Sequence, residues 1–176
     1  MDLDTIYMTL QLPNMEVRYI FRNTIQEWFN HKLEITDLSS LYEALQSGEC
    51  DTVEKILSNQ LLETISYYDY AENYYHGFLS GILKGASGFV ILSNRESGNG
   101  RPDIIMKTLS VKGMAIIIEI KAVKEFKKMQ DACEKALEQI EKLDYETQLH
   151  NEGYRKILKY GICFCGKECV VKRILQ

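Results

Sequence analysis

The most apolar run in the chain, residues 114–118 with the sequence MAIII, constrains the fold more than any other feature. A strand that is apolar on both faces belongs in the middle of a sheet. Shorter apolar runs predict further strands at residues 89–92, 103–106, 161–164 and 170–172. A long amphipathic helix is expected at roughly residues 124–145. This order predicts an α/β fold with a mixed central sheet flanked by helices.

The part of the chain before these strands is expected to be helical. Helices are predicted from Pro13, at residues 38–46, from Asp51 and from Asp69. Glu54 stands three residues after Asp51, which is typical of a capping box. The first three helices carry no catalytic pattern. We therefore expect a helical adaptor region at residues 1–66 and a separate domain at residues 67–176.

Composition narrows the class of protein. The chain has 176 residues, of which 45% are hydrophobic and 26% charged, so one well-packed core is expected and disorder is not. No apolar run is long enough to cross a bilayer and no signal peptide is evident, which predicts a cytoplasmic protein without a membrane partner. The five cysteines are interpreted as buried residues rather than disulfides, although a zinc site at C-x-C-x3-C stays open.

Two charged residues interrupt the apolar strand at its end. Glu119 and Lys121 are two residues apart, so in a strand both point to the same face, while Ile120 points to the other. Burying a carboxylate and an ammonium there is costly unless they serve each other or a ligand. Asp103 follows a glycine-rich turn at the start of the neighbouring strand, and pairing of the two strands would bring its carboxylate beside Glu119.

The spacing D-x15-E-x-K suits phosphodiester hydrolysis. Two carboxylates with an open approach are suitable ligands for Mg²⁺, which would polarise a phosphate and lower the pKa of a bound water. Lys121 would then orient that water or offset the charge on phosphorus. The pattern is short, however, and a simple ion pair between Glu119 and Lys121 at the end of the strand explains it equally well.

Longer segments carry a resemblance to a known family. Around the charged residues, the sequence resembles the PD-(D/E)XK nuclease superfamily, and more narrowly the domain found at the C-terminus of AAA-ATPase-like proteins of bacteria and archaea. The segments concerned are ENYYH at 72–76, ESGNGRPD at 96–103, IIEIK at 117–121, ALEQI at 136–140 and Tyr145. No G-x4-G-K-[ST] motif is present, so the ATPase itself is absent. The chain is therefore expected to be a fragment or a stand-alone relative.

The resemblance implies a restriction-endonuclease-like core, a divalent cation (Mg²⁺ or Mn²⁺) and a nucleic-acid substrate. By position, Asp103, Glu119 and Lys121 correspond to the central triad of the family. Glu72 corresponds to a carboxylate that helps to hold metal, and Gln139 to a polar residue that faces the site. Glu72 also fits a helix cap with Asp69.

Two further residues are weaker candidates for contacts with substrate. Arg101 is placed to contact a phosphate or to pair with Glu96. His76 lies one turn after Glu72 on the same face of its helix, where packing is the usual role of a histidine.

Two functions remain open at this point. The first is a metal-dependent nuclease, with DNA as the expected substrate and RNA not separable from it. The second is a non-catalytic interaction module of the same fold that docks onto an ATPase or another protein. The intact triad favours the first. The formal net charge of −4 fits the second, and it predicts that a nuclease of this kind binds nucleic acid weakly by itself.

Overall fold

The computed structural model describes residues 14–16, 37–64, 72–93 and 100–174. The chain divides into two compact units, Met1–Thr36 and Asp37–Gln176. In the first unit only Asn14, Met15 and Glu16 are described, with Met15 and Glu16 helical. The rest of the helix expected from Pro13 lies outside the described residues. The site that follows belongs entirely to the second unit.

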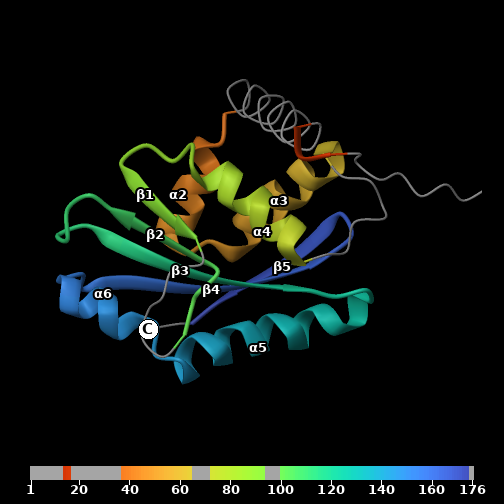
Figure 1. Ribbon diagram of the computed structural model, residues 1–176. Coiled ribbons are helices and arrows are strands. Elements are labelled where there is room, and N and C mark those ends of the chain that lie inside the picture. The colour runs from red at the N-terminus through yellow and green to blue at the C-terminus, as the bar shows by residue number, and fades with distance from the viewer. Residues whose placement is uncertain (1–13, 17–36, 65–71, 94–99, 175–176) are drawn as a thin grey trace, which may run out of the picture. The chain divides into compact units, whose positions relative to one another are not determined.

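A five-stranded mixed sheet forms the centre of the second unit, with the strands in chain order from one edge to the other (Figure 1). Its strands are β1 Phe89–Ser93, β2 Ile104–Thr108, β3 Met114–Ala122, β4 Lys156–Cys165 and β5 Glu168–Arg173. Only the β3–β4 pair is parallel. The central strand, β3, has seven consecutive buried residues from its first position, as expected for a strand covered on both faces.

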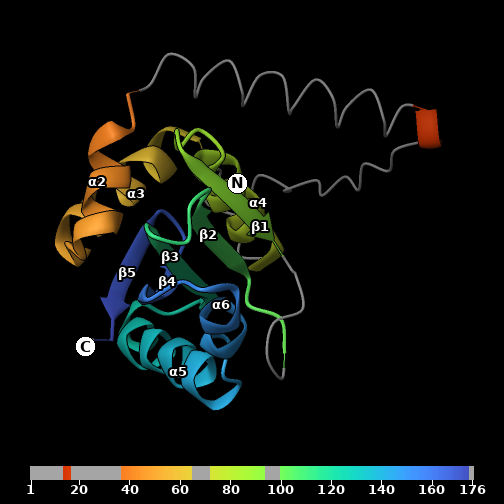
Figure 2. The ribbon, with the colours of Figure 1, turned by 90° about the vertical axis from the view of Figure 1, so that its left-hand side faces the viewer.

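Helices cover both faces of this sheet (Figures 1 and 2). On one side lie α2 Ser39–Ser47, α3 Cys50–Thr64 and α4 Glu72–Leu83, and on the other lie α5 Met129–Lys142 and α6 Glu146–Glu152. Odd-numbered residues of β3, such as Ala115 and Ile117, pack with Ile140 and Tyr145 on the side of α5 and α6. The observed architecture is the α/β, restriction-endonuclease-like fold that the sequence predicts.

The region between β3 and β4 differs from the expected single helix. Helix α5 begins at Met129 rather than near residue 124, because Glu125 has an extended backbone and a 3-10 turn occupies Phe126–Lys128. Asp144 has a left-handed backbone conformation (φ 51°), which ends the helical path of α5 and allows the separate helix α6. Helix α6 was not predicted from the sequence.

Helices α2 and α3 belong to the same compact unit as the sheet. The hydroxyl of Tyr160 on β4 donates a hydrogen bond to the carbonyl oxygen of Leu45 at 2.8 Å. Glu54, expected in a capping box, instead accepts a hydrogen bond from the backbone N–H of Val171 at 3.0 Å. The division into an adaptor at 1–66 and a nuclease-like domain at 67–176 therefore remains a proposal about function, since α2 and α3 pack on the sheet.

Within the described ranges, no helix combines the length and apolar character that crossing a bilayer requires.

Candidate active site

The pairing of β2 with β3 determines where the two candidate carboxylates lie. Ile104 is opposite Ile118, so one further step along both chains brings Asp103 opposite Glu119. Asp103 stands immediately before β2 rather than within it. Because directly opposed residues of an antiparallel pair project from the same face, both carboxylates lie on the face that α5 and α6 cover.

Hydrogen bonds hold these side chains in defined positions. The backbone N–H of Ile120 donates to Asp103 Oδ2 at 2.7 Å, so the carboxylate of Asp103 extends the pairing of the two strands. Lys121 Nζ donates to Glu119 Oε1 at 3.1 Å. The structure thus brings Asp103, Glu119 and Lys121 together near the C-terminal end of β3.

The carboxyl group of Glu119 is buried in an environment that disfavours its charged form. Its side chain is only 3% exposed, and its Oε2 atom has no hydrogen-bond partner among the described residues. Burial, together with the nearby charge of Asp103, raises the pKa of Glu119 to about 7, although the charge and hydrogen bond of Lys121 act to lower it. A buried carboxylate oxygen without a partner, beside a second carboxylate, is a suitable environment for a bound cation.

Glu72 is less closely connected to this pair. It is the first residue of α4 and is exposed. Within the described part of the chain, no group of three acidic, histidine or cysteine side chains is arranged to hold a metal ion, so Glu72 does not join Asp103 and Glu119 in such a group. Cys163 lies beside Lys121 in the β3–β4 register. Burial raises the pKa of Cys163 to about 12, and Cys133, Cys165 and Glu72 add smaller contributions in the same direction. The alternative cap with Asp69 lies outside the described residues.

The segment that carries Asp103 is held from both sides of the sheet. His76 Nε2 lies 3.0 Å from the carbonyl oxygen of Asp103 and 3.0 Å from Ser93 Oγ. Because a carbonyl oxygen only accepts, Nε2 must carry the hydrogen of the first bond. From the other side, the Tyr145 hydroxyl donates to the carbonyl oxygen of Arg101 at 3.3 Å. Histidine and tyrosine therefore contact the backbone on either side of Pro102.

Gln139 reaches the site through Tyr145. Its Nε2 atom donates to the Tyr145 hydroxyl at 3.4 Å, a long hydrogen bond. Burial raises the pKa of Tyr145, and although the bond from Gln139 lowers it, the charges of Glu119 and Asp103 raise it as well. The Tyr145 hydroxyl therefore interacts electrostatically with both carboxylates.

A comparison with protein families agrees with this geometry. The family model described as the PD-(D/E)XK nuclease superfamily matches residues 70–174. The chain belongs to this superfamily. The letters of its name are present here as Pro102-Asp103 and as Glu119-Ile120-Lys121. A search of curated proteins found no match.

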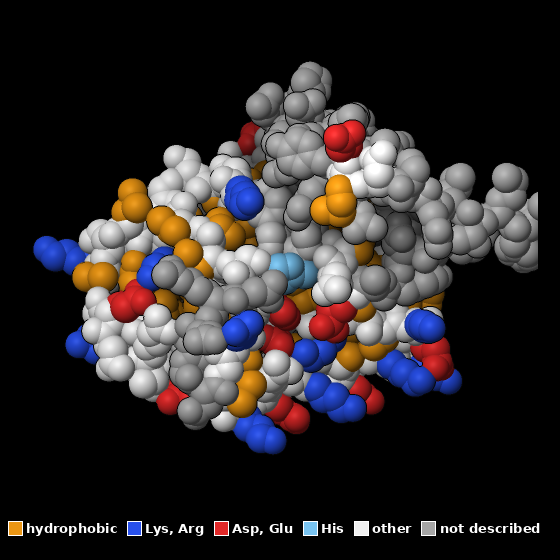
Figure 3. Space-filling view, in the orientation of Figure 1, with side chains coloured by type: hydrophobic (Ala, Val, Ile, Leu, Met, Phe, Trp, Pro, Cys, Tyr) orange, Lys and Arg blue, Asp and Glu red, His pale blue; other side chains and the backbone are white. Residues whose placement is uncertain are grey.

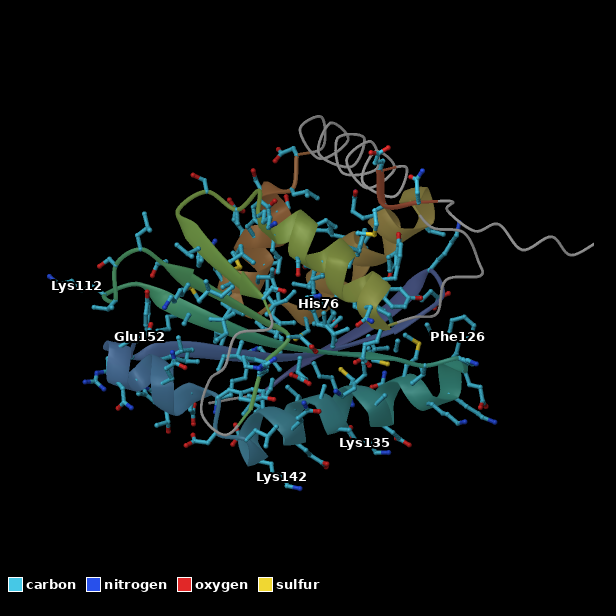
Figure 4. All side chains as sticks on the ribbon, in the orientation of Figure 1. His76, Lys112, Phe126, Lys135, Lys142 and Glu152 are labelled. Atoms are coloured by element: carbon cyan, nitrogen blue, oxygen red, sulfur yellow. The ribbon has the colours of Figure 1, made fainter. Side chains whose placement is uncertain are left out.

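The surface around His76, which contacts the backbone of Asp103, carries charged side chains (Figure 3). Figure 3 shows acidic side chains directly beside a histidine near the middle of the face in view, with basic side chains next to them. Figure 4, in the same orientation, labels His76 at that place. Arg101 is exposed, and its backbone carbonyl accepts the hydrogen bond from Tyr145.

Tyr145 is the residue whose role sequence reasoning missed. In the sequence, Tyr145 is one of the positions that carry the family resemblance, and no role was predicted for it. Its side chain is 1% exposed, and a buried tyrosine hydroxyl normally finds a hydrogen-bond partner. That rule indicates that a partner exists, but the sequence does not indicate that the partner is the backbone beside Asp103.

We predict that Tyr145→Phe weakens Mn²⁺ binding roughly tenfold with a small loss of stability. Mutation of a residue that positions the metal ligands by hydrogen bonding commonly lowers metal affinity by about this factor. Metal affinity would be measured by calorimetry, and the melting temperature in parallel. Tyr154→Phe is a matched control, because Tyr154 belongs to the same apolar cluster and donates to the carbonyl of Thr108, away from the site. Equal metal affinity in the two variants would contradict a positioning role for Tyr145.

Proposed function

We propose that this protein hydrolyses phosphodiester bonds of nucleic acid, with DNA as the expected substrate, using Mg²⁺ or Mn²⁺ held between Asp103 and Glu119. The observation that carries the proposal is the pair of carboxylates on one face of the sheet, beside Lys121. One of them, Glu119, has a buried oxygen with no hydrogen-bond partner among the described residues. Membership of a nuclease superfamily supports the same chemistry.

Each residue has a distinct proposed role. A bound divalent cation would supply Lewis-acid polarisation of the phosphate and an activated water. Asp103, oriented by the N–H of Ile120, and Glu119 would be its ligands, with Glu72 as a candidate third carboxylate. Lys121 would donate hydrogen bonds where negative charge grows on the phosphate oxygens. Gln139 would help to orient the site through Tyr145, and Arg101 is exposed enough to meet a phosphate.

The role of His76 is proposed differently from the substrate contact first expected. Its Nε2 atom is engaged with the carbonyl of Asp103 and with Ser93, so it is better suited to hold the Asp103 segment than to bind substrate.

Metal binding is predicted to raise the melting temperature of the parent protein and not that of Asp103→Asn. Stabilisation by mass action is about 2.7 kcal/mol at a metal concentration a hundred times the dissociation constant. Asparagine keeps an oxygen that can accept from Ile120 N–H but removes the charge, so the fold should survive. Melting would be followed with Mg²⁺, with Mn²⁺ and with a chelator.

A control variant, Asp131→Asn, removes an exposed carboxylate from the first turn of α5. It should respond to metal as the parent does. If Asp103→Asn also responds like the parent, the cation binds elsewhere.

The decisive experiment is a cleavage assay on single- and double-stranded DNA and RNA with Mg²⁺ or Mn²⁺ at low salt. Parent protein should cleave at least one substrate, and Asp103→Asn none. Absence of cleavage by the parent would favour the interaction module over the nuclease. Docking onto an ATPase, like a cytoplasmic location, remains a prediction from the sequence alone.

A further inference from the structure

Positive charge is concentrated directly after the catalytic strand of a chain that is acidic overall. Residues 121–128 (KAVKEFKK) contain four lysines and one glutamate, whereas the whole chain has 21 Lys and Arg against 25 Asp and Glu. The single glutamate, Glu125, pairs with Lys127 at 2.9 Å and also with Lys128. Its charge is therefore compensated within the segment, which keeps a net positive charge.

An aromatic ring lies in the middle of these lysines. Phe126 is 61% exposed, and the flanking side chains of Lys127 and Lys128 are 78% and 59% exposed. Lys124 is also exposed and forms no ion pair with any described residue. The ring stands in a 3-10 turn, whereas Met129, three residues on, is buried against the sheet. Folding thus anchors this segment while its phenylalanine stays in solvent.

The segment lies at the same end of β3 as the proposed metal site. Phe126 is five positions after Lys121, and five extended residues span at most about 18 Å. At roughly 3.4 Å per nucleotide along a helical strand, that reach corresponds to about five nucleotides or fewer. Figure 4 labels Phe126 beyond this end of β3, and Figure 3 shows basic side chains between the middle of the face and that end.

We propose that Lys124, Phe126, Lys127 and Lys128 form a binding surface for single-stranded nucleic acid, which holds the strand leading into the site of Asp103 and Glu119. This inference rests on the proposed nuclease function and adds the class of substrate to it. Aromatic rings that stack on bases, combined with cations that follow the backbone, are how proteins bind single strands without reading their sequence. A duplex keeps its bases stacked inside and offers only its phosphates to the lysines, so the exposed ring favours a single strand.

Binding would be measured by fluorescence anisotropy with labelled single-stranded DNA of about 15 nucleotides, and with the matching duplex, in the absence of divalent metal. Phe126→Ala is expected to weaken single-strand binding roughly tenfold and to change duplex binding little. Loss of the stacking of one base on an aromatic ring commonly lowers affinity by about this factor. Phe126→Tyr should retain most of the affinity. Leu109→Ala is the matched control, because Leu109 is 81% exposed at the β2–β3 turn, at the other end of the sheet.

A second pair of variants tests the charges. Replacing Lys124, Lys127 and Lys128 together by glutamine should make single-strand binding less sensitive to salt. The slope of log affinity against log salt concentration should fall by the equivalent of about one to two phosphate contacts. The control replaces three other exposed lysines, Lys112, Lys135 and Lys142, and changes the net charge equally (Figure 4). Equal losses in the two triple variants would mean that net charge alone is responsible, and the surface would be rejected.

The outcomes separate this inference from the proposed function. If Phe126→Ala binds and cleaves single strands like Leu109→Ala, the surface is wrong while the nuclease assignment stands. If Phe126→Ala loses single-strand and duplex binding equally, base stacking is rejected. If the parent binds single strands through Phe126 but cleaves nothing, the nuclease assignment fails while the surface stands.

Discussion

Replacing Lys121 with alanine is expected to lower the rate of cleavage by about a hundredfold or more, because the variant lacks a donor where charge develops in the transition state. Loss of Lys121 also removes an influence that lowers the pKa of Glu119, so that carboxyl would be more protonated at neutral pH. Rates should therefore be compared above pH 8 with saturating Mn²⁺, where metal binding no longer limits the variant. Under these conditions the remaining loss belongs to the chemical step.

Lys107→Ala is the matched control for this comparison. Lys107 stands on the neighbouring strand, is similarly half-buried with 19% of its side chain exposed against 26% for Lys121, and pairs with Glu152. Its loss should cost a small amount of stability and leave the rate per folded molecule unchanged. If Lys121→Ala behaves in the same way, Lys121 is only an ion-pair partner of Glu119.

Glu119→Gln is expected to abolish cleavage and at the same time to stabilise the metal-free protein at pH 8. In the folded protein burial raises the pKa of Glu119 from 4.5 to about 7. A rise of this size costs on the order of 3 kcal/mol at pH values above 7, where the unfolded chain carries the ionised carboxylate without that penalty. Removing the charge should raise the melting temperature by roughly 5 to 10 °C for a unit of this size.

The pH dependence makes this prediction specific. As the pH falls from 8 to about 4.5, the folded parent takes up a proton before the unfolded chain does, so the parent gains stability from this group. The advantage of Glu119→Gln should therefore shrink towards zero near pH 4.5, and addition of Mg²⁺ at pH 8 should also reduce it. Melting curves between these pH values would be compared with those of Glu134→Gln, an exposed partner of Lys172 that should change little. An advantage that does not depend on pH would contradict a buried ionised Glu119.

The central strand and the same-face arrangement of Glu119 and Lys121 could be predicted from the sequence because both are local. An uninterrupted apolar run indicates a strand buried on both faces, and the two-residue period of a strand places alternate side chains together. The approach of Asp103 to Glu119 required one further assumption, the antiparallel pairing of neighbouring strands. That assumption holds in the structure, with Asp103 one residue outside the strand in which it was expected.

Other features were decided by contacts between distant segments. Glu54 has the spacing of a helix cap, yet its carboxylate bonds to Val171 on β5, more than a hundred residues away. The unexpected helix α6 depends on the left-handed backbone at Asp144, where no glycine indicates it. Phe126 had the pattern of a residue near the start of a long helix, and only the 3-10 turn places it in solvent.

By itself, the sequence therefore determined the α/β class, the central strand and the three residues of the superfamily motif, because periodicity and short spacing act within a few residues of the chain. Only the tertiary structure decided that His76 and Tyr145 hold the backbone around Pro102, and that Glu119 has a buried oxygen without a partner in the described part of the chain. The physical reason is that a long-range hydrogen bond, or the burial of a side chain, depends on two segments of the chain. The sequence of one segment does not identify the segment that will pack against it.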